Sequence, residues 1–464
     1  MKIRDKIGDI FETEIKDLAF DGKSVGSFGG KIVFLNGGLP GEKVKAEITR
    51  TKSKFAIGRV LEIIEPGPGR IKAPCRHFDI CGGCTWQDLV YDRQLFYKRK
   101  QVLDCLRHIG RIDDIEVGEI VGCPEQFYYR NKMEFSFNTN GKDGFNFGLH
   151  RRGRFDRIFD IEECRLQSPR SNSIVAWFRN FITENRIPIY DVEAHTGYIR
   201  FLVIRETKNT GRVMLNIVTA AGDFPLADRL IASAAGEFPE IRTIVHNINT
   251  KKSNIALGES EEILSGPGYI EEKILGCTFR IYANSFFQTN SRQAERLYSL
   301  AFDFLEPNND DTLLDLYCGT GTIGLCAAGR VRQVIGIELE PSAVRAAEEN
   351  ARLNGIDNAI FHTGSVQTIL AEQPELFRSV TAVIVDPPRA GLHPKALKKL
   401  IELGPPKIIY ISCNPATFAR DAAVFREAGY VLSKTVPVDM FPHTMHIELV
   451  GGFYKNESKT PEVL

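Results

Sequence analysis

Three cysteines lie close together in the sequence, at Cys75, Cys81 and Cys84. Thiolates are the ligands that zinc and iron–sulfur clusters use in proteins, and the Cys-x5-Cys-x2-Cys spacing suits either group. A fourth ligand would come from a distant part of the chain. The spacing alone leaves zinc and an iron–sulfur cluster equally open.

A glycine-rich stretch, DLYCGTGTIG at residues 315–324, follows a predicted strand. Glycine lets the backbone turn tightly and lets a ligand approach the main chain. Glu338 ends the next predicted strand, nineteen residues past Gly319, where an acid can bind ribose hydroxyls. Because GTGTIG satisfies the dinucleotide fingerprint, a nicotinamide enzyme is one interpretation. S-adenosylmethionine carries a sulfonium cation and no phosphate, so acids at Asp315, Glu338 and Asp386 favour a methyl donor over a dinucleotide.

Two later loops also carry candidate groups. In Asp386-Pro387-Pro388-Arg389 the prolines stiffen a loop at the carboxyl end of a strand, where open α/β sheets bind ligands. The next predicted strand stops at Cys413, which alone would be interpreted as a buried residue but becomes a candidate nucleophile beside these loops. Glu448 begins an apolar strand, where a carboxylate is costly to bury without a task or a partner.

These loops belong to a repeating pattern from about residue 282 to the end of the chain. Apolar runs such as TLLDLY, QVIGIE, AVIVD and KIIYIS alternate with amphipathic helical segments. Continuous apolar strands separated by helices are typical of a doubly wound parallel sheet. We therefore predict a Rossmann-like domain whose strand ends carry the candidate residues.

The part of the chain before residue 282 has different residue patterns and predicts other elements. Residues 8–66 alternate apolar and polar positions between glycine-rich turns, which predicts a small all-β barrel, and Pro-Gly-Pro-Gly after it predicts a linker. A predicted helical segment with a basic patch at Lys98, Arg99 and Lys100 follows the cysteines. The sequence after it predicts mostly strands to about residue 270. The chain is thus expected to be a multi-domain α/β protein. Its expected parts are a β-barrel at 1–67, a central and mostly β domain at 68–86 and 119–281, and the Rossmann-like domain at 87–118 and 282–464.

Composition excludes several classes of protein. A chain of 464 residues that is 43% hydrophobic and 25% charged is typical of a soluble globular protein with about three domains. No apolar run approaches the ~18 residues that span a bilayer. Acids stand near the N-terminus where a signal peptide is apolar, so we expect a cytoplasmic protein whose cysteines are thiols or metal ligands. With 59 basic and 59 acidic residues, any nucleic acid must be held by local basic surface.

Six motifs together resemble the RNA uracil-5-methyltransferase family. SFFQTN at residues 285–290, DLYCGTGTIGL, GIE, DPPR, SCNP and HTMHIE occur in the family's order. The N-terminal part resembles the family's TRAM domain, an RNA-binding module. The resemblance implies a class I methyltransferase that uses S-adenosylmethionine. Matched by motif, it implies Cys413 as the nucleophile and Glu448 as the base, with the methyl donor held by Gln288, Tyr317, Glu338 and Asp386.

Uracil chemistry explains why such residue types are needed. Carbon 5 of uracil is a poor nucleophile until a thiolate adds to carbon 6, after which it can attack the sulfonium methyl group. A base must then remove the proton on carbon 5 so that the thiolate can leave. The target uridine has to leave any stack to be reached. Phe286 and Phe287 are candidates to stack on it, and membership of the core is the equal alternative.

The cysteine cluster also has a counterpart in this family. CRHFDICGGCTWQ resembles the iron–sulfur segment of the branch that modifies 23S ribosomal RNA, whose fourth cysteine lies in a context like Glu163-Cys164-Arg165-Leu166-Gln167. The resemblance implies a structural [4Fe–4S] cluster. Its ligands would be Cys75, Cys81, Cys84 and Cys164.

Rival chemistries fit the motifs less well. RNA cytosine-5-methyltransferases carry a second cysteine where the loop after Asp386 has none, and amino-group methyltransferases carry an aromatic residue where Arg389 stands. The expected activity is therefore methylation of a uridine in 23S ribosomal RNA by a monomer without a membrane segment. A transfer RNA uridine methyltransferase is the second candidate, because that branch typically lacks the TRAM domain and the cysteines. A non-catalytic RNA-binding assembly factor is the third, and the presence of both Cys413 and Glu448 argues against it.

Overall fold

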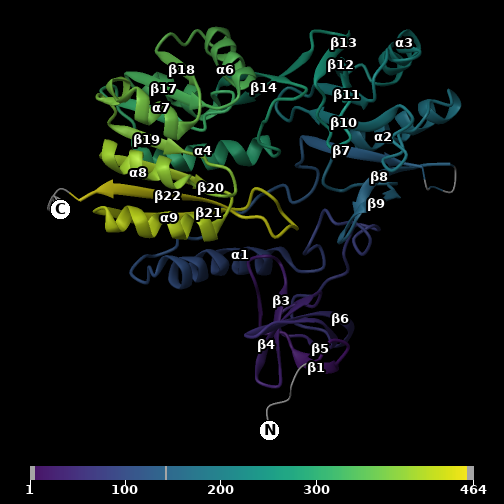
Figure 1. Ribbon diagram of the computed structural model, residues 1–464, viewed down its shortest axis with the longest axis horizontal. Helices are drawn as coiled ribbons and strands as arrows, with labels where there is room; N and C mark the ends of the chain where they lie inside the picture. Colours follow the sequence, from purple (N-terminus) through teal and green to yellow (C-terminus); the bar gives the residue numbers. More distant parts are fainter. Residues whose placement is uncertain (1–5, 140, 142–143, 457–464) are drawn as a thin grey trace.

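The computed structural model describes residues 6–139, 141 and 144–456. Figure 1 shows an N-terminal sheet below two larger units, with the helix α1 running between that sheet and the unit on the left. The unit on the right is built from the middle of the chain and the unit on the left from its C-terminal part.

The N-terminal unit is one six-stranded sheet in the order β1-β5-β6-β4-β3-β2. Its strands alternate buried and exposed residues, and its core contains Phe11, Ile15 and Leu35. The prediction of an all-β unit is thus confirmed, while its closure into a barrel stays a prediction. The strands are β1 Ile10–Glu14, β2 Asp17–Leu18, β3 Ser24–Phe28, β4 Lys31–Asn36, β5 Lys43–Thr51 and β6 Phe55–Glu65.

The central unit is a seven-stranded sheet in the order β13-β12-β11-β10-β7-β8-β9, with only β11 and β12 parallel among its described pairs. Helices α2 (Pro169–Glu184) and α3 (Ala227–Glu237) pack on it and share its aromatic-rich core. Ser168 caps α2 by accepting a hydrogen bond from the Ser171 N–H. The strands are β7 Lys132–Asn138, β8 Asn146–Arg151, β9 Arg154–Asp160, β10 Ile199–Glu206, β11 Val213–Thr219, β12 Ile241–Ile248 and β13 Ser260–Ser265.

The C-terminal unit has the predicted Rossmann-like architecture. Its sheet has the order β18-β17-β16-β19-β20-β22-β21, and the first five strands are parallel. Strand β22 runs antiparallel to both β20 and β21. These strands are β16 Thr312–Leu316, β17 Gln333–Glu338, β18 Ala359–Thr363, β19 Ala382–Val385, β20 Lys407–Ser412, β21 Tyr430–Val438 and β22 Glu448–Lys455.

Helices cover this sheet, and apolar clusters that include its strand residues pack against them. The hairpin β14–β15 (Tyr269–Ile274 and Cys277–Tyr282) precedes the first of these helices. They are α4 Ser291–Leu305, α5 Thr322–Ala327, α6 Pro341–Leu353, α7 Val366–Glu372, α8 Pro394–Leu403 and α9 Pro415–Glu427.

Helix α1 (Tyr91–Cys105) joins the C-terminal unit although it lies far from it in the sequence. Val102, Cys105 and Leu106 belong to the same apolar cluster as residues of β20 and α9. The domain boundaries given above stay predictions, but these contacts support the assignment of 87–118 to the C-terminal unit.

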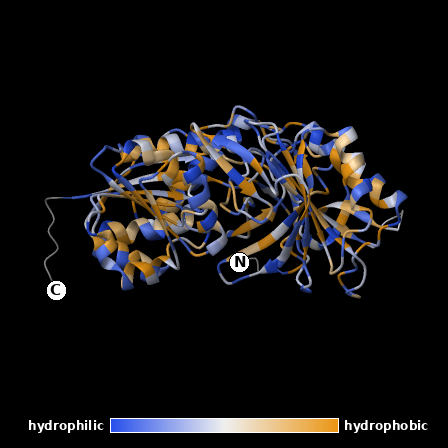
Figure 2. Ribbon diagram, turned by 90° about the horizontal axis from the view of Figure 1, so that it is seen from above, coloured by the Kyte–Doolittle hydropathy of each residue, from blue (hydrophilic) through white to orange (hydrophobic). Residues whose placement is uncertain are grey.

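Hydrophobic and hydrophilic residues are interspersed along the helices of both larger units, as the colours of Figure 2 show. Within the described part of the chain, no helix has the length and apolar character needed to cross a membrane.

Candidate active site

The parallel strands bring four predicted site residues to one edge of the sheet. Tyr317 comes directly after β16, and Glu338 is the last residue of the neighbouring strand β17. Asp386 follows β19 and Cys413 follows β20, which are the next strands on the other side of β16. Since the carboxyl ends of parallel strands share an edge, these residues surround one region.

Glu448 reaches the same edge by a different route. Ser412 pairs with Leu449 at the end of the antiparallel ladder of β20 and β22, and Cys413 and Glu448 are the residues next to that last pair. Cys413 is half-buried, and Glu448 is buried with 5% of its surface exposed. The nucleophile and the base that the motifs imply therefore lie close together, and Glu448 is near enough to raise the pKa of Cys413.

The loops around Cys413 are tied together by one asparagine. The Asn414 side chain accepts a hydrogen bond from the Ala416 N–H at 3.0 Å, capping α9, and donates to the Arg389 carbonyl at 2.9 Å. The same residue thus starts a helix and fixes the DPPR loop. Hydrogen bonds thus join the SCNP and DPPR loops along one side of the site.

Charges in this site act on one another. Burial raises the pKa of Glu448 well above its ordinary value, Asp386 raises it further, and Arg389 opposes the rise. Burial also raises the pKa of Cys413 to about 11, with Glu448 and Asp386 adding to the effect and Arg389 again opposing it. Burial raises the pKa of Asp386 to about 7. The surroundings of the site therefore favour the neutral forms of Cys413, Glu448 and Asp386.

The glycine-rich loop has an open side and a closed side. Gly319 has a φ of +56°, and a Cβ there would meet nothing within 4 Å. Its N–H donates to a Glu338 carboxylate oxygen at 3.0 Å, so Glu338 also holds the loop. At Gly324, by contrast, a Cβ would lie 2.8 Å from the Val334 side chain.

Asp315 takes a supporting position instead of facing a ligand. It has no exposed surface, and one carboxylate oxygen accepts the Gly324 N–H at 2.9 Å. Burial raises its pKa to about 7. Of the three acids weighed from the sequence, Asp315 therefore anchors the start of α5, whereas Glu338 and Asp386 lie at the open edge.

Gln288 lies in the segment before α4, and the central unit holds that segment in place. The Asn131 side chain donates to the Gln288 carbonyl at 2.8 Å, and the Asn131 N–H donates to the Thr289 carbonyl at 2.9 Å. The two neighbouring aromatics differ: Phe287 is buried in the core, whereas Phe286 is 71% exposed. Only Phe286 of this pair has a free face for stacking.

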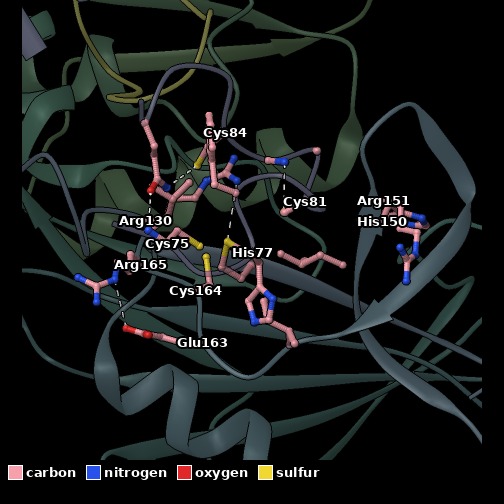
Figure 3. Close-up of a pocket in the computed structure, with 18 of the residues that line it drawn as sticks. Cys75, His77, Cys81, Cys84, Arg130, His150, Arg151, Glu163, Cys164 and Arg165 are labelled. Atoms are coloured by element: carbon pink, nitrogen blue, oxygen red, sulfur yellow. Dashed lines mark hydrogen bonds and ion pairs between the residues drawn. The ribbon is translucent and has the colours of Figure 1, made fainter. Parts of the chain in front are cut away.

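The four predicted cysteine ligands line one cavity of about 740 Å³ beside the central sheet. In Figure 3, Cys75, Cys81, Cys84 and Cys164 surround the same space, close to His77 and Arg130. The cavity therefore brings the Cys-x5-Cys-x2-Cys segment together with Cys164, which lies eighty residues after Cys84 in the sequence.

Polar contacts fix these cysteines. Gln87 accepts the Cys75 N–H at 3.1 Å and donates to the Cys84 sulfur at 3.2 Å. Asn172 of α2 accepts the Cys164 N–H at 2.8 Å and donates to the Cys164 carbonyl at 3.0 Å. The sequence alone did not indicate either amide as part of the site.

The surroundings of Cys84 disfavour its thiolate form. Burial raises the pKa of Cys84 to about 12, a donor from Gln87 opposes this, and the other three cysteines add to the rise. Across residues 6–139, 141 and 144–456, no group of three or more His, Cys, Asp or Glu residues has the arrangement to hold a metal ion. The [4Fe–4S] cluster and the zinc alternative are therefore not confirmed, and the assignment of the four cysteines as ligands stays a prediction, although all four line the same cavity.

Sequence reasoning missed the contacts that hold the loop before Glu448. Lys98, which the sequence placed in a basic patch, is fully buried and forms an ion pair with Asp439 at 2.6 Å. A basic triplet on a predicted helix gives no sign that one of its members points inward. Tyr91 lies seven positions before Lys98, so the helical period places both on one face of the helix. In the structure Tyr91 also contacts Asp439.

Comparison with known proteins agrees with this geometry. Residues 255–456 match the family model described as tRNA (Uracil-5-)-methyltransferase, and residues 4–61 match the model of the TRAM domain. An RNA methyltransferase of Caldanaerobacter subterraneus is 41% identical over 451 residues, which are 97% of this chain and 99% of that protein. One of Chlorobaculum tepidum is 39% identical over 477 residues, or 98% of each chain.

A solved structure extends the likeness to three dimensions. The Pyrococcus abyssi tRNA (uracil-54, C5)-methyltransferase in complex with S-adenosyl-L-homocysteine superposes with a TM-score of 0.77 at 31% identity. The match covers 96% of this chain and 100% of the archaeal chain. With its TRAM domain, its Rossmann-like sheet and the ordered motifs at that sheet's edge, this chain belongs to the RNA uracil-5-methyltransferase family.

Proposed function

We propose that this protein transfers a methyl group from S-adenosylmethionine to carbon 5 of a uridine, with 23S ribosomal RNA as its first candidate substrate. The observation that carries the proposal is that Cys413 and Glu448 both adjoin the last β20–β22 pair, at the edge that also bears Glu338 and Asp386. A thiol beside a buried carboxylate is the pair that addition to carbon 6 and removal of the carbon-5 proton require.

Gln288, Tyr317, Glu338 and Asp386 are the proposed binding residues for the methyl donor. The place of Tyr317, Glu338 and Asp386 at the carboxyl edge of the parallel strands supports this, as does the S-adenosyl-L-homocysteine bound by the Pyrococcus abyssi enzyme. A sulfonium cation bound beside Asp386 would lower the pKa of Cys413, because an opposite charge favours the thiolate. Binding of the donor would in this way prepare the nucleophile.

In the proposed reaction, the Cys413 thiolate adds to carbon 6 of a flipped uridine, and the electron pair of the C5–C6 bond moves onto the ring as an enolate. Carbon 5 then takes the methyl group from the sulfonium, which becomes a neutral thioether. The Glu448 carboxylate takes the proton from carbon 5, the electron pair of that C–H bond restores the C5–C6 double bond, and the S–C6 pair leaves with Cys413 as its thiolate. Phe286 is placed to stack on the extruded base.

Transfer RNA is the second candidate substrate, because the Pyrococcus abyssi protein is named for it and matches this chain along its whole length. The three-part architecture therefore does not separate the two substrates. The proposal of 23S ribosomal RNA rests on the resemblance of the cysteine segment to the ribosomal branch.

We further propose that Cys75, Cys81, Cys84 and Cys164 hold a [4Fe–4S] cluster. Their shared cavity supports this, and so does the raised pKa of the buried Cys84 thiol, which a bound cation would lower. A bound cluster would cross-link the segment 75–84 to Cys164 and so shape the surface beside it. Iron and sulfide analysis of anaerobically purified protein should give about four of each per chain. Stoichiometric zinc without iron or sulfide would contradict the assignment.

A methylation assay with both RNAs tests the function. Purified protein is incubated with S-adenosylmethionine and either 23S ribosomal RNA or transfer RNA that lacks 5-methyluridine, and the products are mapped by mass spectrometry. We expect 5-methyluridine at a defined position of the ribosomal RNA. Modification of transfer RNA alone would support the second candidate, and binding without methylation of either would support the assembly factor.

A further inference from the structure

One face of α1 is directed at the loop that leads into Glu448. Tyr91, Gln94 and Lys98 are spaced three and four residues apart, so they lie on one side of the helix. Each of them contacts residues 439–447, the irregular segment between β21 and β22. The end of this segment sets the position of Glu448.

Lys98 forms the strongest of these contacts. Its ammonium group donates to one carboxylate oxygen of Asp439 at 2.6 Å and to the Phe441 carbonyl at 3.0 Å, and both charged side chains are fully buried. The Tyr91 hydroxyl donates to the other oxygen of Asp439 at 2.8 Å. The Phe441 N–H donates to Asp439 at 3.1 Å. The pair is thus completely enclosed by partners, and these partners belong to the loop or to α1.

Gln94 holds the same loop at His443, four residues after Asp439. Its side-chain oxygen accepts the His443 N–H at 2.9 Å, and its amide nitrogen lies 3.1 Å from His443 Nδ1. His443 has a φ of +67°, which an L-residue adopts only when its surroundings impose it. The His443 carbonyl accepts the N–H groups of Thr85 and Trp86 at 2.8 and 3.0 Å.

Two further donors hold the loop from other sides. The Asn290 side chain donates to the Met440 carbonyl, and the Tyr129 hydroxyl donates to the Pro442 carbonyl, both at 3.1 Å. Each carbonyl of the four successive residues 440–443 therefore accepts a hydrogen bond from another part of the chain. These contacts fix the loop that directly precedes Glu448, and they therefore restrict the position of Glu448 at the start of β22.

We propose that Lys98 is a positioning residue for Glu448: through Asp439 and the Phe441 carbonyl it fixes the loop that sets the base carboxylate against carbon 5 of the bound pyrimidine. This inference rests on the proposed role of Glu448 as the base. Lys98 itself touches no reacting atom. Its loss would leave Cys413, on the other strand, able to form the covalent bond.

The test separates positioning from stability by removing the charges in two ways. Lys98→Met leaves Asp439 buried without its cation, which is strongly destabilising, whereas Lys98→Met/Asp439→Leu replaces the pair by apolar side chains, which is often neutral or stabilising. Lys100→Met is the matched control on the same helix, because Lys100 pairs with Asp17 and Asp104 and not with the loop. Glu448→Gln serves as the reference for a lost base.

Each variant is assayed with uridine-containing RNA for methyl transfer in a single turnover, for multiple turnover, and for RNA that stays attached to protein after denaturation. We expect Lys98→Met/Asp439→Leu to unfold at or near the wild-type temperature. Its multiple turnover should fall by about tenfold to a hundredfold, which is the cost of a small misplacement of a catalytic group. Methyl transfer in the first turnover should persist, and the covalent complex should accumulate as in Glu448→Gln. Lys100→Met should accumulate none.

Two outcomes would overturn the proposal. In one, the folded double variant turns over at the wild-type rate without a trapped complex. In the other, it loses methyl transfer and release to the same extent, which indicates a general structural role. If Glu448→Gln itself turns over normally and traps nothing, the role of Glu448 fails and this inference fails with it. If Glu448→Gln traps RNA and the Lys98 variants do not, only the positioning role is wrong.

Discussion

Burial and two nearby carboxylates raise the pKa of Cys413 to about 11, which favours the thiol over the thiolate. Cys413 follows β20, whereas the glycine-rich loop follows β16 and Glu338 ends β17. The proposed nucleophile and these proposed donor-binding residues therefore stand on different strands of one edge. The two functions should therefore separate on mutation.

We predict that Cys413→Ala abolishes turnover while the dissociation constant for S-adenosylmethionine stays within about twofold of wild type, since the lost sulfur is not among the proposed donor-binding groups. Calorimetric titration and a methylation assay measure the two quantities. Cys277→Ala, which removes another half-buried thiol at the start of β15, is the control and should retain turnover. Loss of donor binding in folded Cys413→Ala protein would contradict the role.

Asp386 should make stability depend on pH. Because burial raises its pKa in the folded state to about 7, folding favours the protonated carboxyl. Its contribution to the free energy of unfolding is greatest below the unfolded pKa, near 4, and is lost as the pH rises toward 7.

We therefore predict that Asp386→Asn raises the free energy of unfolding above pH 7 and has a smaller effect near pH 4. The same change should weaken binding of S-adenosylmethionine. Urea denaturation at both pH values, together with donor titration, tests this. Equal stability changes at the two pH values would show that the Asp386 carboxyl is not held protonated in the folded protein.

At the scale of elements, the Rossmann-like sheet could be predicted because its strands are continuous apolar runs, each followed by a helix. The edge bearing Glu338, Asp386 and Cys413 followed from that pattern. The loop at 439–447 could not be predicted, since Lys98 and Asp439 are 341 positions apart and nothing in a basic triplet marks an inward side chain. The N-terminal sheet was predicted from alternation alone, which does not specify whether its edges meet.

The glycine-rich loop gives a prediction at this scale. A Cβ at Gly324 would lie 2.8 Å from Val334 and 2.9 Å from an Asp315 oxygen, whereas a Cβ at Gly329 would meet nothing within 4 Å. We predict that Gly324→Ala lowers the melting temperature by several degrees and weakens donor binding, because α5 must move away from β16 and β17. Gly329→Ala should be neutral or slightly stabilising. Thermal unfolding with and without S-adenosylhomocysteine compares them, and equal effects would contradict the packing argument.

At the scale of the whole molecule, a chain with no net charge must bind RNA through local basic surface. Lys52 and Lys54 are exposed between β5 and β6 of the N-terminal sheet, which matches the TRAM model. The central unit adds Arg151 and Arg154 at the rim of the cysteine-lined cavity. The balanced composition excludes a net positive charge that would attract RNA to the whole molecule. It could not show that these two basic surfaces belong to separate units.

We predict that Lys52→Glu/Lys54→Glu weakens RNA binding by about tenfold at low salt and reduces the slope of log K against log salt concentration by about one to two. Donor binding should not change. Lys398→Glu, a substitution of an exposed lysine on α8, is the control. Filter binding at several salt concentrations measures the slopes, and identical slopes for wild type and the double variant would exclude this surface from RNA binding.

The central claim is that Cys413 and Glu448 act in sequence on one pyrimidine, and the Glu448→Gln enzyme tests it most directly. Removing the base should stop the reaction after methyl transfer, because the carbon-5 proton then has no acceptor and the S–C6 bond cannot break. Mass spectrometry of the denatured complex with ordinary uridine RNA should show methylated RNA attached to the peptide that contains Cys413. Normal turnover with no attached RNA, or attachment at a different cysteine, would contradict the account.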